Sequence, residues 1–177
     1  MTESIDLNDI SNGFAGLTPT SGNHLLEGCV ITLHRQSHGK GVILKIFGDT
    51  DKEYDLHWPD IVSDQLDRTW KDQIYATEQA AVCLGILIAL KLTGFEVIER
   101  SVRKTGCDYW IGNNDGSLFQ KKARLEVSGI FTGDKDGVVM RYKAKCKQTS
   151  QSDSSWLPAY VSVSEFSKPI SKFGEKK

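Results

Sequence analysis

The sequence lacks the features that mark several protein classes. Its 177 residues include four cysteines and four prolines, and the cysteines lie far apart with no CxxC pair. A disulfide framework or a cysteine-based zinc site is therefore not predicted, and we expect reduced, structural cysteines in a cytoplasmic protein. The first residues are acidic and polar, with neither a basic start nor an apolar run, so we expect no signal peptide.

Long apolar runs are also missing. The longest, AVCLGILIAL at 81–90, is followed by Lys91 and falls short of the roughly 20 apolar residues that a membrane-spanning helix needs. We therefore predict a buried helix and no membrane partner. The sequence contains no phosphate-binding P-loop, no dinucleotide fingerprint and no GxSxG nucleophile motif, so it gives no signal for the enzymes that depend on them.

The net charge of −1 hides an uneven distribution of charge along the chain. Residues 1–98 carry seven Lys and Arg against fourteen Asp and Glu, whereas residues 99–177 carry fifteen against nine. A basic C-terminal half indicates a surface that faces a polyanion such as DNA or RNA, although solvated helix faces give similar counts.

The pattern of residues predicts four segments. Residues 1–23 have little periodicity and are predicted to form a flexible tail. Residues 24–74 contain three β-rich runs with tight turns, CVITLHRQ, GVILKIFG and KEYDLHW, and then helical spacing over 60–73. They predict an antiparallel β-meander, either a small lobe or an extension of the main sheet, with a short helix. Residues 75–170 are predicted to form the main α/β core, and 171–177 a C-terminal tail.

The predicted core has the order helix, three strands, helix, strand. Thr77 is the expected N-cap of the first helix, which is apolar nearly all round and ends at Gly94. Strands are expected at 95–102, 107–112, 122–131 and 160–166, with a lysine-rich helix over 135–147 before the last of them. The fold class is thus α/β (α+β), a meander of three strands covered by two helices.

Two acids carry the predicted chemistry. Asp108 starts the strand DYWIG, and Glu126 lies among apolar neighbours inside ARLEVSG. Neighbouring strands are about 4.8 Å apart, so acids at matching heights on one face can share a divalent cation. An unpaired carboxylate in an apolar strand is costly, so Glu126 needs a metal, a cation or a hydrogen-bond donor.

The order of elements and these acids resemble the PD-(D/E)XK nuclease-like superfamily, over about half of the chain. The resemblance implies a restriction-endonuclease-like α-β-β-β-α-β core. It assigns Asp108 and Glu126 as ligands of Mg²⁺ or Mn²⁺, and Glu78 as the helix acid that completes the site. The sequence departs from the family at the motif lysine, because E-x-K would place lysine at 128 and this chain has Ser128.

The missing positive charge is expected from the following helix. Arg141, Lys143 or Lys145 could project into the site, and Lys143 and Lys145 are the predicted catalytic substitutes. Arg141, Lys143, Lys145 and Lys147 are predicted to contact phosphates. The ordinary alternative for these four residues is a solvated helix face.

Each predicted acid also has a structural alternative. Asp108 could cap a turn at the start of its strand, and Glu78 could serve only as a helix N-terminal acid. Glu126 could form an internal ion pair with Arg124 or with a helix lysine.

Two functions follow, and both remain open at this point. The first is a metal-dependent nuclease acting on phosphodiester bonds of DNA or RNA. The second is a catalytically inactive nuclease fold that serves as a binding or scaffold subunit of a bacterial complex, with the N-terminal lobe as the surface for a protein partner. A third, weaker alternative places the functional surface at residues 28–58.

Overall fold

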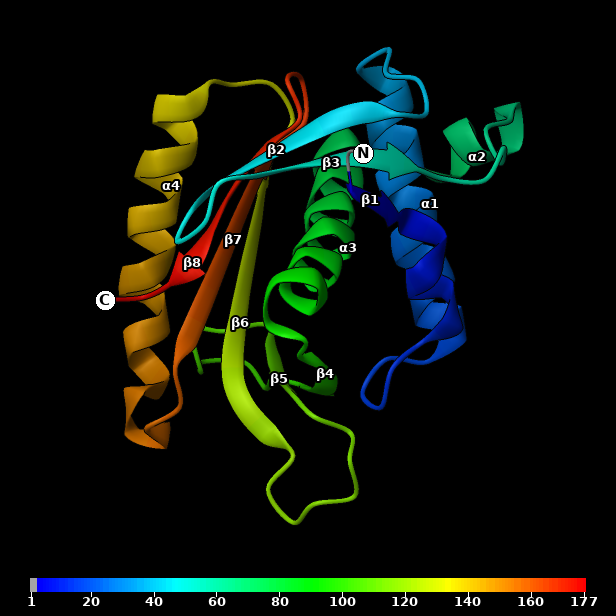
Figure 1. Ribbon diagram of the computed structural model, residues 1–177. Coiled ribbons are helices and arrows are strands. Elements are labelled where there is room, and N and C mark those ends of the chain that lie inside the picture. Colours follow the sequence, from blue (N-terminus) through cyan, green and yellow to red (C-terminus); the bar gives the residue numbers. More distant parts are fainter. Residues whose placement is uncertain (1–2) are drawn as a thin grey trace.

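A computed structural model describes residues 3–177 of the chain (Figure 1). Its strands form one eight-stranded mixed sheet in the order β1-β3-β2-β8-β7-β6-β5-β4. The strands are β1 (Glu3–Asp6), β2 (Val42–Gly48), β3 (Lys52–His57), β4 (Glu96–Arg100), β5 (Tyr109–Gly112), β6 (Lys121–Ile130), β7 (Ala159–Glu165) and β8 (Ile170–Glu175). The helices are α1 (Pro19–Arg35), α2 (Asp64–Thr69), α3 (Gln73–Thr93) and α4 (Lys135–Gln148), with short 3-10 helices η1 (Leu7–Asn12) and η2 (Thr149–Ser155).

The sheet is covered on both faces. Helix α4 lies on one side, and α3 with α1 behind it lies on the other (Figure 1). The predicted meander is present, because β4, β5 and β6 pair antiparallel in sequence order. After α4 the chain returns in β7, which pairs parallel to β6. The predicted order of helix, three strands, helix and strand is therefore confirmed.

Helix α3 forms the centre of the core. Asp72 is its N-cap and accepts hydrogen bonds from the backbone amides of Ile74 (2.9 Å) and Tyr75 (3.1 Å). The predicted start at Thr77 is wrong, because the aspartate five residues earlier satisfies the first free amides. The predicted end at Gly94 is confirmed, with φ at 74°. This helix is long and apolar enough to cross a membrane, but 61% of its most apolar stretch is buried inside the protein, as in a core helix.

Two glycines let α3 approach β6. A Cβ added to Gly85 would lie 2.5 Å from the Val127 side chain, and one added to Gly129 would lie 2.7 Å from the carbonyl oxygen of Thr77. Both distances are shorter than van der Waals contact. The absence of side chains at these positions therefore fixes the height of α3 above the strand.

The N-terminal predictions need correction. Residues 28–35 lie in α1 and not in a strand, because the Thr18 cap and Pro19 start a helix whose apolar face packs against α3. Residues 3–23 are not a flexible tail, since β1 pairs with β3 and the side chains of Leu7 and Ile10 are buried. Residues 1 and 2 of the predicted tail lie outside the described residues.

The predicted C-terminal tail is wrong, and the meander is an extension of the main sheet and not a separate lobe. Strands β2 and β3 do form a hairpin, but β2 pairs with β8 and so joins the main sheet. Strand β8 occupies most of the predicted tail at 171–177, where the alternation of Phe173 and its neighbours was too short to recognise. The short helix expected within 60–73 is present as α2.

Candidate active site

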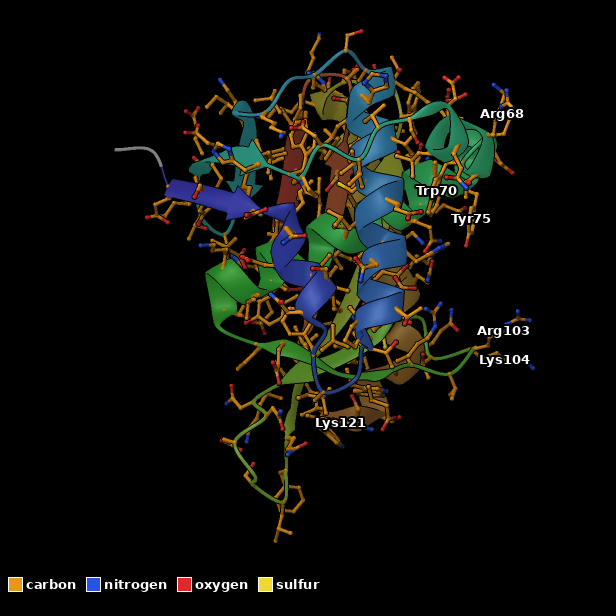
Figure 2. All side chains as sticks on the ribbon, turned by 90° about the vertical axis from the view of Figure 1, so that its right-hand side faces the viewer. Arg68, Trp70, Tyr75, Arg103, Lys104 and Lys121 are labelled. Carbon is orange, nitrogen blue, oxygen red and sulfur yellow. The ribbon has the colours of Figure 1, made fainter. Side chains whose placement is uncertain are left out.

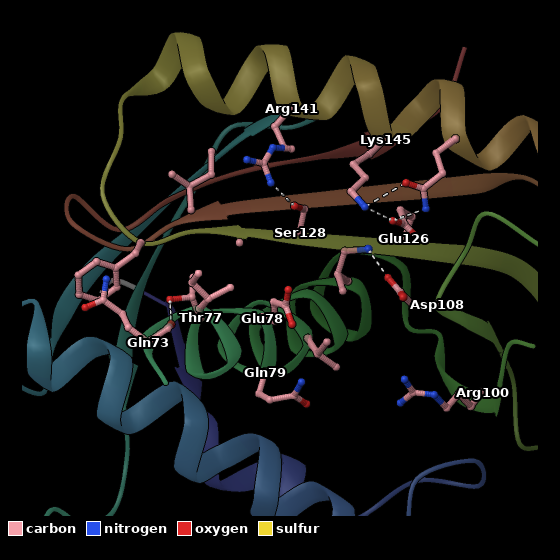
Figure 3. Close-up of a pocket in the computed structure, with 17 residues that line it drawn as sticks. Gln73, Thr77, Glu78, Gln79, Arg100, Asp108, Glu126, Ser128, Arg141 and Lys145 are labelled. Carbon is pink, nitrogen blue, oxygen red and sulfur yellow. Dashed lines mark hydrogen bonds and ion pairs between the residues drawn. The ribbon is translucent and has the colours of Figure 1, made fainter. Parts of the chain in front are cut away.

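A cavity of about 620 Å³ opens beside β6, between α3 and α4. Figure 3 shows α4 along one side of the cavity and α3 along the other, with β6 between them. Its polar lining includes Glu78, Asp108, Glu126, Ser128, Arg141 and Lys145. Four of the five predicted catalytic residues therefore face one cavity.

The cavity lies where β5 leaves β6. The last residue pair between these strands is Tyr109 with Leu125, and the Asp108 amide donates to the Leu125 carbonyl at 2.8 Å. Beyond this point β6 continues to Ile130 paired only with β7. Asp108 caps the open edge, because its Oδ2 accepts a hydrogen bond of 2.9 Å from the Val127 amide.

The register places the two predicted acids together. Continuing the antiparallel pairing by one residue sets Asp108 opposite Glu126, so both side chains leave the same face of the sheet. Cross-strand neighbours at such positions have Cβ atoms roughly 5 Å apart. The relationship expected from the sequence is therefore present, directly before β5 and inside β6.

Glu126 is nearly inaccessible, with 2% of its surface exposed. Its Oε1 accepts hydrogen bonds from Lys145 Nζ at 2.7 Å and from Gln148 Nε2 at 2.9 Å. Burial and the neighbouring Asp108 carboxyl raise the pKa of Glu126 to about 7, although Lys145 acts to lower it. Proton uptake by this carboxyl is thus poised near neutral pH.

Other charged groups stand around the two acids. Glu78 points into the cavity from the first turns of α3 (Figure 3). Arg141 donates a hydrogen bond of 3.2 Å to the hydroxyl of Ser128, the residue at the motif-lysine position. Arg100, at the end of β4, also lines the cavity and lies 5.6 Å from the centre of the Tyr109 ring.

The structure separates the predicted basic residues. Lys145 and Arg141 line the cavity, whereas Lys143 and Lys147 are exposed and do not. The reason is helical spacing: positions 141, 145 and 148 share the face of α4 turned toward β6, and 143 and 147 lie on another. Gln148 was not predicted, although its place three residues after Lys145 could have indicated it. Arg100 gave no such signal.

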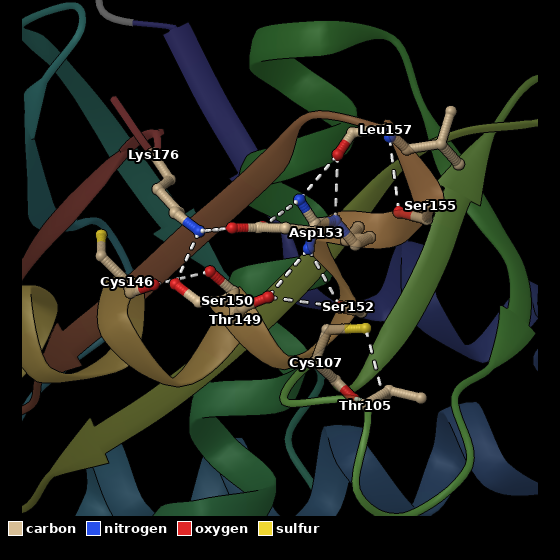
Figure 4. Close-up of polar contacts among 11 residues, drawn as sticks. Thr105, Cys107, Cys146, Thr149, Ser150, Ser152, Asp153, Ser155, Leu157 and Lys176 are labelled. Atoms are coloured by element: carbon tan, nitrogen blue, oxygen red, sulfur yellow. Dashed lines mark hydrogen bonds and ion pairs between the residues drawn. The ribbon is translucent and has the colours of Figure 1, made fainter.

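Arg124, the predicted alternative partner of Glu126, lies elsewhere. Its guanidinium is buried among the carbonyls of Thr149 and Leu157, the Ser152 hydroxyl and the Asp153 carboxylate (Figure 4). Asp153 in turn pairs with Lys176 at 2.7 Å. This network fixes the segment between α4 and β7 and leaves Lys145 as the cation beside Glu126.

The donor set fits a hard divalent cation that keeps some of its water. Among residues 3–177, no three His, Cys, Asp or Glu side chains gather closely enough to hold a metal by themselves. Two carboxylates are nevertheless directed into one cavity, and Val127 turns its backbone toward the open edge. Mg²⁺ binds through one or two carboxylates with waters and substrate oxygens completing its shell.

Comparison with known proteins adds no relative on which to base an assignment. No protein-family model, no curated protein and no solved structure matches the chain.

Proposed function

We propose that the protein is a metal-dependent nuclease that hydrolyses phosphodiester bonds of nucleic acid. The observation that carries this proposal is the facing pair of Asp108 and Glu126 beside a cavity, with Lys145 bonded to Glu126. The two carboxylates face each other where β6 is no longer paired with β5, next to an ammonium group. Paired carboxylates can hold a divalent cation, so the arrangement is suited to phosphoryl transfer.

Asp108 and Glu126 would hold Mg²⁺ or Mn²⁺. The Val127 carbonyl is a further oxygen donor, because a strand residue turns its amide and its carbonyl to the same side and the Val127 amide faces Asp108. Glu78 approaches from α3 and would accept a hydrogen bond from a metal-bound water. When bound, the cation lowers the pKa of a water and polarises a phosphodiester oxygen.

Lys145 would take the role of the absent motif lysine. Its ammonium lies beside Glu126, where it stabilises negative charge that develops on the attacked phosphate. Arg141 reaches the same side of the cavity through its bond to Ser128 and would bind a phosphate oxygen. Lys143 and Lys147 would contact phosphates only outside the cavity.

The arrangement of elements supports a restriction-endonuclease-like core. Helix α3, the antiparallel β4–β5–β6 meander, α4 and the parallel β7 follow the order implied by the resemblance to PD-(D/E)XK nucleases. Asp108 directly precedes the second strand of the meander and Glu126 lies within the third, which supports assigning them the ligand roles that the resemblance implies.

Cleavage of plasmid DNA and of RNA in the presence of Mn²⁺ tests the proposal. Asp108→Asn should abolish cleavage, because it keeps the shape of the side chain and the acceptor for the Val127 amide but removes the charge. Glu99→Gln serves as the matched control, since Glu99 is exposed and pairs with Lys121 away from the cavity. Cleavage by the Asp108→Asn variant at the rate of the parent protein would refute the assignment.

One observation favours the second function, a catalytically inactive binding or scaffold subunit. Both hydrogen bonds to Oε1 of Glu126 come from the protein itself, so Lys145 and Gln148 already compensate the buried charge. Calorimetric titration with millimolar Mg²⁺ or Mn²⁺ separates the two functions. Binding that is lost in Asp108→Asn supports the nuclease, and no binding by the parent protein supports the scaffold.

A further inference from the structure

An aromatic cluster stands at the start of α3, next to the cavity. The Tyr75 ring stacks on the Trp70 ring, with centroids 5.7 Å apart and planes inclined by 14°. His24 of α1 packs against the same Trp70 ring at 4.6 Å. Three separate elements, α1, the end of α2 and the start of α3, thus converge on one stacked pair.

Hydrogen bonds fix the orientation of both rings. Trp70 Nε1 donates to the Glu27 carboxylate at 3.0 Å, and the Tyr75 hydroxyl lies 2.9 Å from His24 Nε2. Trp70 is only 2% exposed, whereas Tyr75 is 45% exposed. Tyr75 is therefore a rigidly held ring that stacks on Trp70 and remains open to solvent. Because its orientation is already fixed, little conformational entropy is lost when a second flat group stacks on it.

The platform adjoins the candidate active site. Ile74, the residue before Tyr75, lines the cavity and is itself 74% exposed. Glu78 lies one helical turn after Ile74 and points into the same cavity (Figure 3). A strand of nucleic acid bound along this cavity would thus reach the start of α3, where Tyr75 follows Ile74.

A basic loop lies along the same edge of the molecule. Arg103 and Lys104 are exposed in the loop that joins β4 to Asp108, and Figure 2 shows them below Trp70 and Tyr75 on one side. The loop has a defined shape, because the Thr105 hydroxyl bonds to the Val102 carbonyl at 2.9 Å and the Cys107 thiol contacts Thr105 (Figure 4). Two exposed cations thus lie in this loop, five and four residues before a proposed metal ligand.

We infer that Tyr75 is a stacking platform for an unpaired base of single-stranded nucleic acid, whose backbone crosses the cavity and meets Arg103 and Lys104. The inference rests on the proposed function, because that function places a phosphodiester of the nucleic acid at the two acids and so gives the path of its backbone. An exposed ring can take a base only if a face of that base is free, as in a single strand and not in a continuous duplex. Stacking accepts any base, and the two cations accept any phosphate, so no sequence preference is expected.

Binding of labelled oligothymidylate and oligouridylate of about 12 nucleotides, a length within the range of single-strand sites, tests the inference. Fluorescence anisotropy is measured without divalent metal, so that cleavage plays no part. Tyr75→Ala should weaken binding roughly 5- to 100-fold, the loss expected for one stacked base. Tyr75→Phe keeps the ring and should bind within about twofold of the parent protein. Preference for one of the two strands tells DNA from RNA.

One control and one further variant make the result specific. Trp156 is 93% exposed and does not line the cavity, so Trp156→Ala should leave binding unchanged. The double variant Arg103→Met/Lys104→Met should weaken binding and reduce its dependence on salt, whereas Tyr75→Ala should keep the salt dependence. Thermal unfolding of each variant shows that the fold is retained.

The outcomes separate this inference from the nuclease proposal. Equal binding by Tyr75→Ala and the parent protein, an equal loss in Trp156→Ala, or duplex bound as tightly as single strands would overturn the stacking platform while leaving metal-dependent cleavage untouched. Conversely, Tyr75-dependent binding by a protein that cuts nothing with Mn²⁺ would refute the nuclease and support the platform.

Discussion

Lys145 on α4 donates a hydrogen bond of 2.7 Å to the buried carboxylate of Glu126 on β6. The two residues are 19 positions apart, whereas the motif of the proposed nuclease family places its lysine two positions after the acid, where this chain has Ser128. A cation therefore reaches the acid from the covering helix and not from the strand. The contact identifies Lys145, and not Lys143, as the lysine beside the acids, a choice that the sequence alone does not determine.

Replacing Lys145 by methionine should abolish most of the proposed nuclease activity. The variant loses the ammonium that lowers the pKa of Glu126, so that pKa should rise above about 7 and leave the carboxyl largely protonated at neutral pH. We expect Mn²⁺-dependent cleavage to fall by about 100-fold or more, as when one charge-stabilising donor is removed. Initial rates on a labelled strand measure the effect.

Lys143→Met is the matched control, because Lys143 lies two residues away on the same helix but outside the cavity. At saturating substrate it should retain the turnover rate of the parent protein within about twofold, because a phosphate contact outside the cavity contributes to binding and not to the chemical step. A similar loss in both variants would indicate a general effect of helix charge and would contradict a specific role for Lys145.

The core could be predicted from the sequence because its signals are local. The apolar run of α3, the Gly94 stop and the alternation in β6 each fix one element within a few residues. Helix α1 was mistaken for a strand because Val30, Ile31 and Thr32 are β-branched, a preference that packing against α3 overrides. Strands β1 and β8 are short, and their strand conformation depends on hydrogen bonding to neighbouring strands of the sheet.

The site was predictable only in part. Asp108 and Glu126 could be paired from the expected strand order, since neighbouring antiparallel strands bring a strand start opposite a strand interior. The choice of Lys145 over Lys143 depends on the rotation of α4 about its axis, which no periodicity in this polar helix determines. The open edge of β6 depends on where β5 begins: the sequence predicts a strand from residue 107, whereas pairing with β6 starts at Tyr109.

Removal of the Arg124 guanidinium should destabilise the fold without touching the acids. Arg124→Met would leave the carbonyls of Thr149 and Leu157 without their buried donor and would break the pair with Asp153. We expect a loss of about 2–4 kcal/mol in the free energy of unfolding. Urea denaturation followed by circular dichroism measures it.

Lys176→Met provides the comparison for Arg124, because it removes the outer partner of the half-exposed Asp153 and of the exposed Ser150 hydroxyl. This change should cost less than about 1 kcal/mol. An Arg124→Met variant as stable as Lys176→Met would show that the buried network does not hold the segment between α4 and β7.

An alanine at position 129 should disturb both stability and activity. The added Cβ would lie 2.7 Å from the Thr77 carbonyl oxygen and 3.0 Å from Ala81 Cβ, so α3 must move away from β6. Such overpacking costs about 1–3 kcal/mol, and the movement would displace Glu78 from the cavity and slow cleavage.

Gly39→Ala is the control for that change, since nothing lies within 4 Å of its added Cβ. It should alter the free energy of unfolding by less than about 0.5 kcal/mol. If Gly129→Ala and Gly39→Ala unfold at the same urea concentration, the close approach of α3 to β6 is not needed for the fold.

Glu126 should make the protein less stable as pH rises toward neutrality. The pKa of this carboxyl is raised from its ordinary value of 4.5 to about 7 by burial and by Asp108. Between these two values the unfolded chain releases the proton while the folded chain keeps it, so increasing pH favours unfolding. The loss should be on the order of 3 kcal/mol across this window, complete above about pH 7 and absent below about pH 4.5.

Glu126→Gln isolates this contribution, because glutamine cannot ionise and every other titrating group is shared. The unfolding free energy of the variant minus that of the parent protein should therefore increase between about pH 5 and about pH 8, measured by urea denaturation. A constant difference would mean that Glu126 has an ordinary pKa. Saturating Mn²⁺ should reduce the increase, since a bound cation stabilises the ionised carboxylate that burial disfavours.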